Sequence, residues 1–119
     1  MSSIVLFSDQ FNYYLHSGPT SMRKSFDGLC AIIRDELGKQ INAKDVFIFL
    51  NKERTHVKIL LYEPDGFSLF YRRLHKGRFA RPAHSAAMGS TQLSAMDLLS
   101  MLWGLHLHRI RKEVQVIPS

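Results

Sequence analysis

The chain has 119 residues, of which 45% are hydrophobic and 22% charged, so its composition is that of an ordinary globular protein rather than a disordered or coiled-coil chain. Its 16 Lys and Arg outnumber its 10 Asp and Glu, and the resulting net charge of +6 suits a polyanionic partner such as nucleic acid, or simply a basic soluble protein. The single cysteine excludes an internal disulfide and a multi-cysteine zinc site.

The length predicts a single domain over residues 1–119, with a compact core at about 11–103 and a basic, partly disordered tail at 105–119. No apolar run approaches the roughly 20 residues that span a bilayer, and the N-terminus lacks a basic leader. We therefore expect a cytoplasmic protein with no membrane partner.

A strand and a helix are the first predicted elements. Alternating apolar residues predict the strand over 11–15, and Gly18-Pro19 breaks the chain after it. Thr20 or Ser21 then caps a helix over 22–37 that ends at Gly38. One apolar stripe runs along this helix and contains Met22, Phe26, Leu29, Cys30, Ile33 and Leu37.

Two cations, Arg23 and Lys24, fall in the first turn of the predicted helix, where they oppose the helix dipole. A bound anion would reverse the sign of that interaction, because free amides and two cationic side chains form a phosphate site. The alternative is that both side chains are solvated and that Arg23 pairs with Asp27.

Three further strands form a predicted antiparallel meander. The continuous apolar run at 46–50 predicts a central strand buried on both faces. A β-hairpin follows over 57–79, because two apolar runs flank the turn sequence Glu63-Pro64-Asp65-Gly66.

The last predicted helix covers 91–103, after a loop of small residues at 80–90. Ser90 or Thr91 caps it, Gly104 ends it, and its apolar face contains Leu93, Met96, Leu99, Leu102 and Trp103. The predicted fold is therefore α+β: an antiparallel sheet of about four strands, one amphipathic helix packed on it, and a second, C-terminal helix.

The second strand of the hairpin ends in a basic patch. Asp and Glu are absent between Asp65 and Asp97, whereas cations gather there with two aromatic residues among them. Cations that neutralise phosphates beside aromatics that stack on bases are typical of nucleic-acid binders. The alternative is that the aromatics belong to the core and the cations only solubilise a sheet edge. The patch comprises Tyr71, Arg72, Arg73, His75, Lys76, Arg78, Phe79 and Arg81.

Catalytic motifs are missing from the sequence. It has no Gly-rich phosphate loop, no His-Glu-x-x-His and no Gly-x-Ser-x-Gly, and its carboxylates are scattered over turns and helix surfaces. His106 and His108 could share a strand face and bind a metal, but the neighbouring arginines favour surface groups. Cys30 falls on an apolar stripe, as expected of a core residue. We expect no enzyme, no cofactor and no metal site.

An ordered set of motifs over residues 11–82 resembles the TnpB accessory proteins of the insertion-sequence 66 family of bacterial transposable elements. These motifs are Gly18-Pro19-Thr20-Ser21-Met22-Arg23-Lys24-Ser25-Phe26-Asp27-Gly28-Leu29, Val46-Phe47-Ile48-Phe49 with Asn51, Lys58-Ile59-Leu60-Leu61, Asp65-Gly66-Phe67, Tyr71-Arg72-Arg73-Leu74 and Gly77-Arg78-Phe79. The last third of the chain matches only loosely, and Arg81 stands where many relatives carry an aromatic residue.

The resemblance implies a part in transposition without strand cutting, which the family assigns to a separate transposase. We therefore expect a non-catalytic accessory protein that binds DNA, such as the element ends, and works with other transposition proteins. The expected DNA contacts are Arg23, Lys24, Tyr71, Arg72, Arg73, Lys76 and Arg78. The alternative is a protein-interaction module that docks on the transposase through a sheet edge or through an exposed apolar patch at Met96, Met101 and Trp103.

Overall fold

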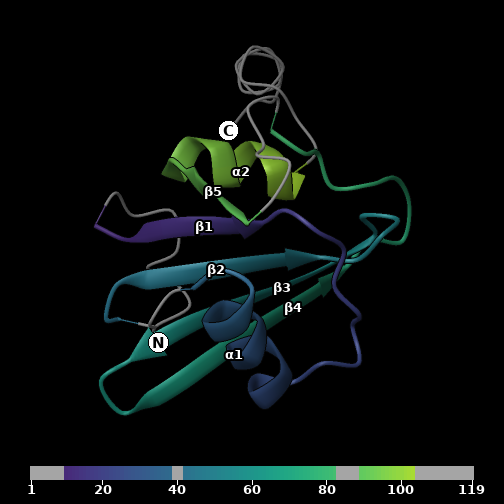
Figure 1. Cartoon of the computed structure of the whole chain (residues 1–119). Helices are drawn as coiled ribbons and strands as arrows, with labels where there is room; N and C mark the ends of the chain where they lie inside the picture. Colours follow the sequence, from purple (N-terminus) through teal and green to yellow (C-terminus); the bar gives the residue numbers. More distant parts are fainter. Residues whose placement is uncertain (1–9, 39–41, 83–88, 104–119) are drawn as a thin grey trace.

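A five-stranded mixed sheet organises the residues that this computed structural model describes, namely 10–38, 42–82 and 89–103 (Figure 1). The strand order is β4-β3-β2-β1-β5, and the two helices are α1 and α2. The bounds are β1 Asn12–His16, α1 Phe26–Asp35, β2 Asp45–Leu50, β3 His56–Glu63, β4 Gly66–Arg73, β5 Ser90–Leu93 and α2 Ala95–Trp103.

The prediction of an α+β fold is confirmed, but the sheet differs from the predicted one of about four antiparallel strands. β1 pairs with β2 in parallel, because the chain returns through α1 to the end of the sheet from which β1 started. The meander of β2, β3 and β4 is antiparallel, as expected, and β5 is an additional strand antiparallel to β1.

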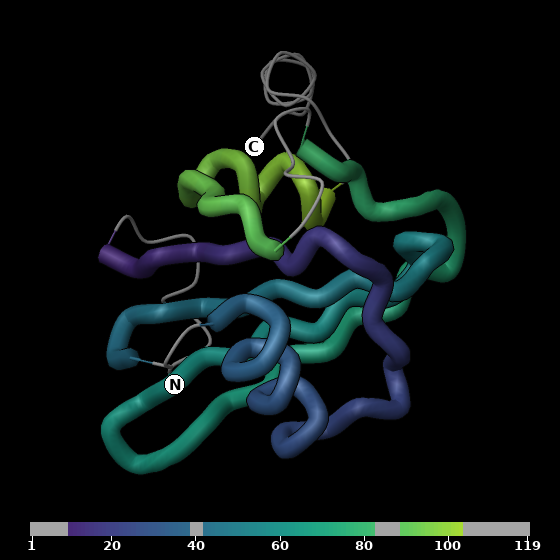
Figure 2. Tube along the Cα trace, in the orientation of Figure 1, coloured from purple at the N-terminus to yellow at the C-terminus, as the bar shows by residue number. Residues whose placement is uncertain are grey.

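Each face of the sheet packs against one helix, as Figure 2 shows for α1 in front of the strands. Leu29, Ile32 and Ile33 of α1 pack against Phe47, Phe49 and Leu60. On the other face, three side chains of α2 join alternate residues of β1, β2 and β3 in the larger core. These α2 residues are Leu98, Met101 and Leu102. The predicted central position of β2 is confirmed, since all six of its residues are buried.

The hairpin has the predicted turn. Glu63 pairs with Gly66 across the two residues Pro64 and Asp65, which fixes the register of all eight residue pairs between β3 and β4. Val57 and Arg72 therefore share one face of the sheet, and Lys58 and Tyr71 share the other.

The first helix begins later than predicted, at Phe26 instead of Met22. Arg23 and Lys24 thus precede the N-cap Ser25 and do not belong to the first turn of the helix. The first turn of α1 carries Asp27, the charge that the dipole favours. Arg23 and Asp27 form no ion pair in the structure.

The second helix is also shorter than predicted, because residues 90–93 form β5. Its N-terminal cap is Ser94, not Ser90 or Thr91: Ser94 Oγ accepts a 3.0 Å hydrogen bond from Asp97 N, and Asp97 Oδ2 accepts one of 3.1 Å from Ser94 N. The predicted stop Gly104, the tail at 105–119 and most of the predicted loop lie outside the described residues. Neither described helix is long and apolar enough to cross a membrane.

Candidate nucleic-acid interface

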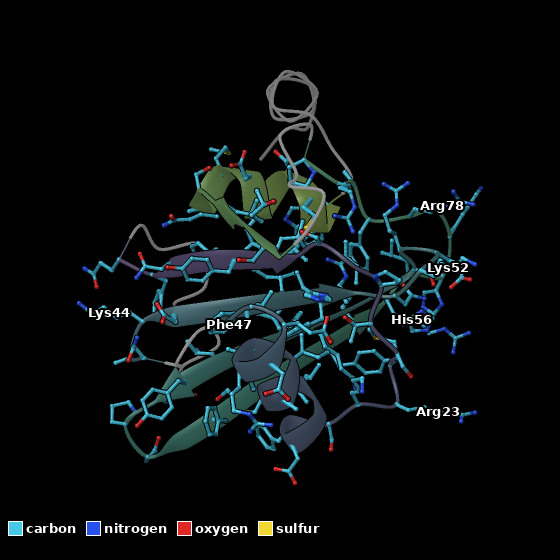
Figure 3. The ribbon with its side chains drawn as sticks, in the orientation of Figure 1. Arg23, Lys44, Phe47, Lys52, His56 and Arg78 are labelled. Atoms are coloured by element: carbon cyan, nitrogen blue, oxygen red, sulfur yellow. The ribbon has the colours of Figure 1, made fainter. Side chains whose placement is uncertain are left out.

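Exposed cations gather at one end of the sheet, where β2 ends, β3 begins and β4 ends. Figure 3 shows Arg23, Lys52 and Arg78 at this end and Lys44 at the opposite end of the molecule. Three segments supply these cations: the turn before α1, the β2–β3 loop and the loop after β4. We call this surface the basic end; it comprises the exposed Arg23, Lys24, Lys52, Lys76 and Arg78 and the half-buried Arg54.

Asn51 holds the β2–β3 loop in shape. Its side-chain oxygen accepts hydrogen bonds of 2.9 Å from the backbone amides of both Thr55 and His56. Its amide nitrogen lies 3.0 Å from Thr55 Oγ1. With both ends of its side chain engaged, Asn51 closes the loop and lets Arg54 adopt a left-handed backbone with φ of 60°.

The loop after β4 is attached to the β2–β3 loop by two backbone hydrogen bonds. Leu74 N donates to Thr55 O at 2.9 Å, and Phe79 N donates to Arg54 O at 2.7 Å. Phe79 is fully buried, so it anchors this loop in the core and does not stack on bases. The exposed residues between these anchors include Lys76 and Arg78.

A buried cation, Lys58, positions the turn before α1. Its Nζ donates to Met22 O at 2.8 Å and to Lys24 O at 2.7 Å, and it lies 5.2 Å from the centre of the Tyr71 ring. Because a buried ammonium needs such partners, these bonds fix the backbone that carries Arg23 and Lys24 beside β4.

A shallow cleft of about 630 Å³ lies between the turn before α1 and the β2–β3 loop. Arg23, Lys52 and His56 line it, together with Glu53, its one carboxylate. This shared lining confirms that the two basic segments lie next to each other. The remaining lining residues are Pro19, Thr20, Ser21, Met22 and Asn51.

The charge of the basic end is not neutralised within the described part of the chain. In the described residues Arg34 pairs with Asp35, and His16 Nε2 lies 3.1 Å from Glu36 Oε1; neither contact involves a cation of the basic end. Next to this end, burial and the repulsion of Arg54 lower the pKa of Arg81. Glu53 also lies at this end but forms no ion pair with these cations, which therefore outnumber it and create a positive potential that attracts anions.

The structure separates the site residues that the sequence predicts. Arg23, Lys24, Lys76 and Arg78 belong to the basic end. Arg73 is exposed at the end of β4, at its rim. Tyr71 lies on the same face as Arg73, is 52% exposed, and stacks on the His56 ring at 6.0 Å. Arg72 lies on the opposite face, where its guanidinium carbon is 4.4 Å from the centre of the Trp103 ring.

Sequence reasoning missed Lys52, Arg54 and Lys58. Lys52 and Arg54 belong to Asn51-Lys52-Glu53-Arg54, a polar segment between two predicted strands whose sequence indicates a turn but not its nearness to Arg23. Lys58 offered a signal of its own, because a lone cation among the apolar residues of a strand needs a buried partner or an exposed face.

Metal binding and cysteine-based catalysis find little support in the described residues. They contain no group of three or more His, Cys, Asp or Glu side chains that could hold a metal ion. Burial, and secondarily Asp27, raises the pKa of the Cys30 thiol, although Arg34 partly opposes this shift, so the reactive thiolate is disfavoured. His106 and His108 lie outside the described part of the chain.

Comparison with known proteins places the chain in a family. The family described as "IS66 Orf2 like protein" matches residues 11–112. An uncharacterized protein, y4hO of Sinorhizobium fredii (strain NBRC 101917 / NGR234), is 28% identical over 92 residues, which cover 77% of this chain and 78% of that protein. No solved structure matches the chain significantly. Because the family match covers most of the sequence, the chain belongs to the IS66 Orf2-like family of transposition accessory proteins.

Proposed function

We propose that this protein is a non-catalytic accessory factor that binds DNA through its basic end. Phosphate contacts come from Arg23, Lys24, Lys52, Lys76 and Arg78, and DNA of the transposable element is the natural target. Arg73 and Tyr71 lie at the rim of this surface and extend it along β4. Arg72 is not among the primary contacts, because it is on the other face of the sheet, over Trp103.

One observation carries the proposal: three separate segments are fastened together so that their cations share one end of the sheet. Lys58, Asn51 and the two backbone bonds of the 74–79 loop supply the fastening. Cations that only solubilise a surface do not require such positioning. Cations that contact a phosphate backbone do require such positioning, because the phosphate charges are regularly spaced.

The chemistry of the surface favours backbone contact over base reading. Its side chains are lysines and arginines in loops, and the two described helices, α1 and α2, pack on the sheet and do not project from the basic end (Figure 1). Such a surface binds many sequences with similar affinity and depends strongly on salt. Choice of the element ends would then fall to a partner such as the transposase.

A second candidate function is docking on another transposition protein, favoured by the exposed side of α2. Met96 and Trp103 are 47% and 53% exposed and are seven residues apart, which places them on one face of the helix. Met101, the third member of the predicted patch, is buried and takes no part. Exposed large apolar side chains at this spacing suit a protein groove.

The decisive experiment measures binding of the purified protein to element-end DNA and to unrelated DNA of equal length, over a range of salt concentrations. We expect similar affinities for both, with an affinity that falls steeply as salt rises. Much tighter binding to the ends would show that the protein itself recognises the site.

The absence of binding at low salt would overturn the DNA proposal and favour docking. In that case the transposase should co-purify with the protein, and the complex should survive nuclease treatment. The complex should also survive charge reversal at Lys76 and Arg78 but not replacement of Met96 and Trp103 by Ser.

A further inference from the structure

The outer edge of β4 is the most exposed apolar strand edge of the described structure. β4 is an end strand of the sheet, and no described strand pairs with its outer side. It is eight residues long, and its stretch from Phe67 to Tyr71 contains no charge. Long, uncharged edge strands pair readily with further strands, and proteins usually block them with charges or Pro.

Exposed aromatic residues cluster at this edge. Phe67, Phe70 and Tyr71 are 40%, 39% and 52% exposed, although all three lie within β4. Phe26, at the start of α1, is 39% exposed and packs on Phe67 with ring centres 5.6 Å apart. Among the residues that the structure describes, four of the six exposed large apolar side chains therefore surround one strand, as expected of an interface.

We propose that β4 pairs with β4 of a second copy of this chain, in antiparallel orientation about a two-fold axis at Leu69. This two-fold axis is perpendicular to the sheet, so each face of one sheet continues into the same face of the other. Each residue of β4 must therefore stand opposite a residue whose side chain lies on that same face. With Leu69 on the axis, Phe67 of each copy lies opposite Tyr71 of the other. The pairing joins the two five-stranded sheets into one.

Charge complementarity supports this register. Asp65, at the hairpin turn, falls next to Arg73 of the second copy, and the symmetry repeats the contact. Neither residue forms an ion pair within the described part of its own chain. Shifting either copy by one residue would bring opposite faces together and lose both the aromatic and the charged pairs.

The dimer goes beyond the proposed DNA contact and overlaps the proposed DNA surface only at its rim. It occupies Tyr71 and Arg73, the rim residues, and leaves the basic end of each copy accessible. Because the strands run antiparallel, the two basic ends lie at opposite ends of the joined sheet. One dimer then presents two separate phosphate-binding surfaces.

The test is the mass of the full chain in solution without DNA, measured by analytical ultracentrifugation over a range of protein concentrations. We expect a dimer of two 13.7 kDa chains. The variants Asp65→Arg and Arg73→Asp each replace two attractive pairs by two repulsive ones, so each should raise the dissociation constant roughly tenfold or more. The double variant Asp65→Arg/Arg73→Asp exchanges the charges and should restore the dimer.

The matched control is Lys44→Asp, a charge reversal just before β2, which β3 separates from the β4 edge, and it should leave the dimer intact. Circular dichroism of every variant shows whether it has folded, and rescue by the double variant cannot arise from misfolding. A wild-type monomer at all concentrations would overturn the proposal, as would single variants that dimerise like the wild type. Because no DNA is present, failure of the DNA proposal would leave this result unchanged.

Discussion

Lys58 is the residue on which the placement of Arg23 and Lys24 depends. Its ammonium group is buried under the turn before α1 and donates to the carbonyl oxygens of Met22 and Lys24. The N-cap residue of α1, Ser25, makes no side-chain hydrogen bond to the helix. The start of α1 therefore lacks the usual side-chain cap, and the hydrogen bonds of Lys58 hold the turn before it. The bonds of one buried side chain therefore connect the core of the sheet to the basic end.

We predict that Lys58→Met destabilises the protein by about 1–3 kcal/mol, because two carbonyls lose a charged donor. Urea unfolding measures this loss. Hydrogen exchange should also accelerate at the amides of residues 22–25, and DNA affinity should fall although Lys58 itself is buried.

Lys52→Met is the matched control, since it removes an exposed cation from the same surface. It should weaken DNA binding and leave the free energy of unfolding unchanged. If Lys58→Met were as stable as the wild type, with unchanged exchange near Met22, Lys58 would not be the fastening residue.

At the scale of elements, α2 depends on a local cap where β5 ends. Ser94 and Asp97 exchange two hydrogen bonds, which satisfy amides at the start of the helix. The cap also marks the boundary at which the chain leaves the sheet. Its loss should shift the helix that delivers Leu98 and Met101 to the core.

We predict that Ser94→Ala lowers the free energy of unfolding by about 1 kcal/mol, the usual value of such a cap. Ser100→Ala, in the same helix but away from its start, is the control and should change stability little. Thermal or urea unfolding distinguishes the two variants; equal stabilities would show that the cap is unimportant.

The elements that could be predicted from the sequence are those with a strong local pattern. The hairpin carries its turn in Glu63-Pro64-Asp65-Gly66, and β2 is a continuous apolar run, so the sequence predicts both. The bounds of β2 are correct to one residue, whereas the hairpin ends at Arg73 and not at 79. By contrast, β5 is four residues long, and its pairing with β1 joins segments more than 70 residues apart. No local signal reveals such a strand, and its residues were assigned to the following helix.

The sequence also predicted only part of the candidate site: some of the cations that belong to it, but not how they are placed in space. Clustering in sequence identified the cations after β4, but alternation along the strand placed Arg72 and Arg73 on opposite faces. Which of two adjacent arginines points toward α2 depends on the position of Trp103 in space. The approach of Arg23 to Lys52 depends on the parallel pairing of β1 and β2, which no local sequence pattern indicates.

At the scale of the whole molecule, the cations of the described residues are unevenly distributed. The basic end carries at least three cationic segments, whereas Lys44 stands at the opposite end (Figure 3). If net charge alone attracted DNA, a reversed charge at either end would weaken binding equally. If the basic end is the binding surface, the position of the reversed charge decides the effect.

We predict that Lys76→Glu/Arg78→Glu reduces the slope of log affinity against log salt by about two, because two phosphate contacts are lost. Lys44→Glu should lower affinity only slightly and leave the slope unchanged, and Arg72→Glu should resemble Lys44→Glu because its side chain is engaged with Trp103. Fluorescence anisotropy with one duplex at several salt concentrations gives all of these slopes. Equal slopes for the double variant and for Lys44→Glu would mean that DNA senses only the total charge, and the basic end would then not be a binding surface.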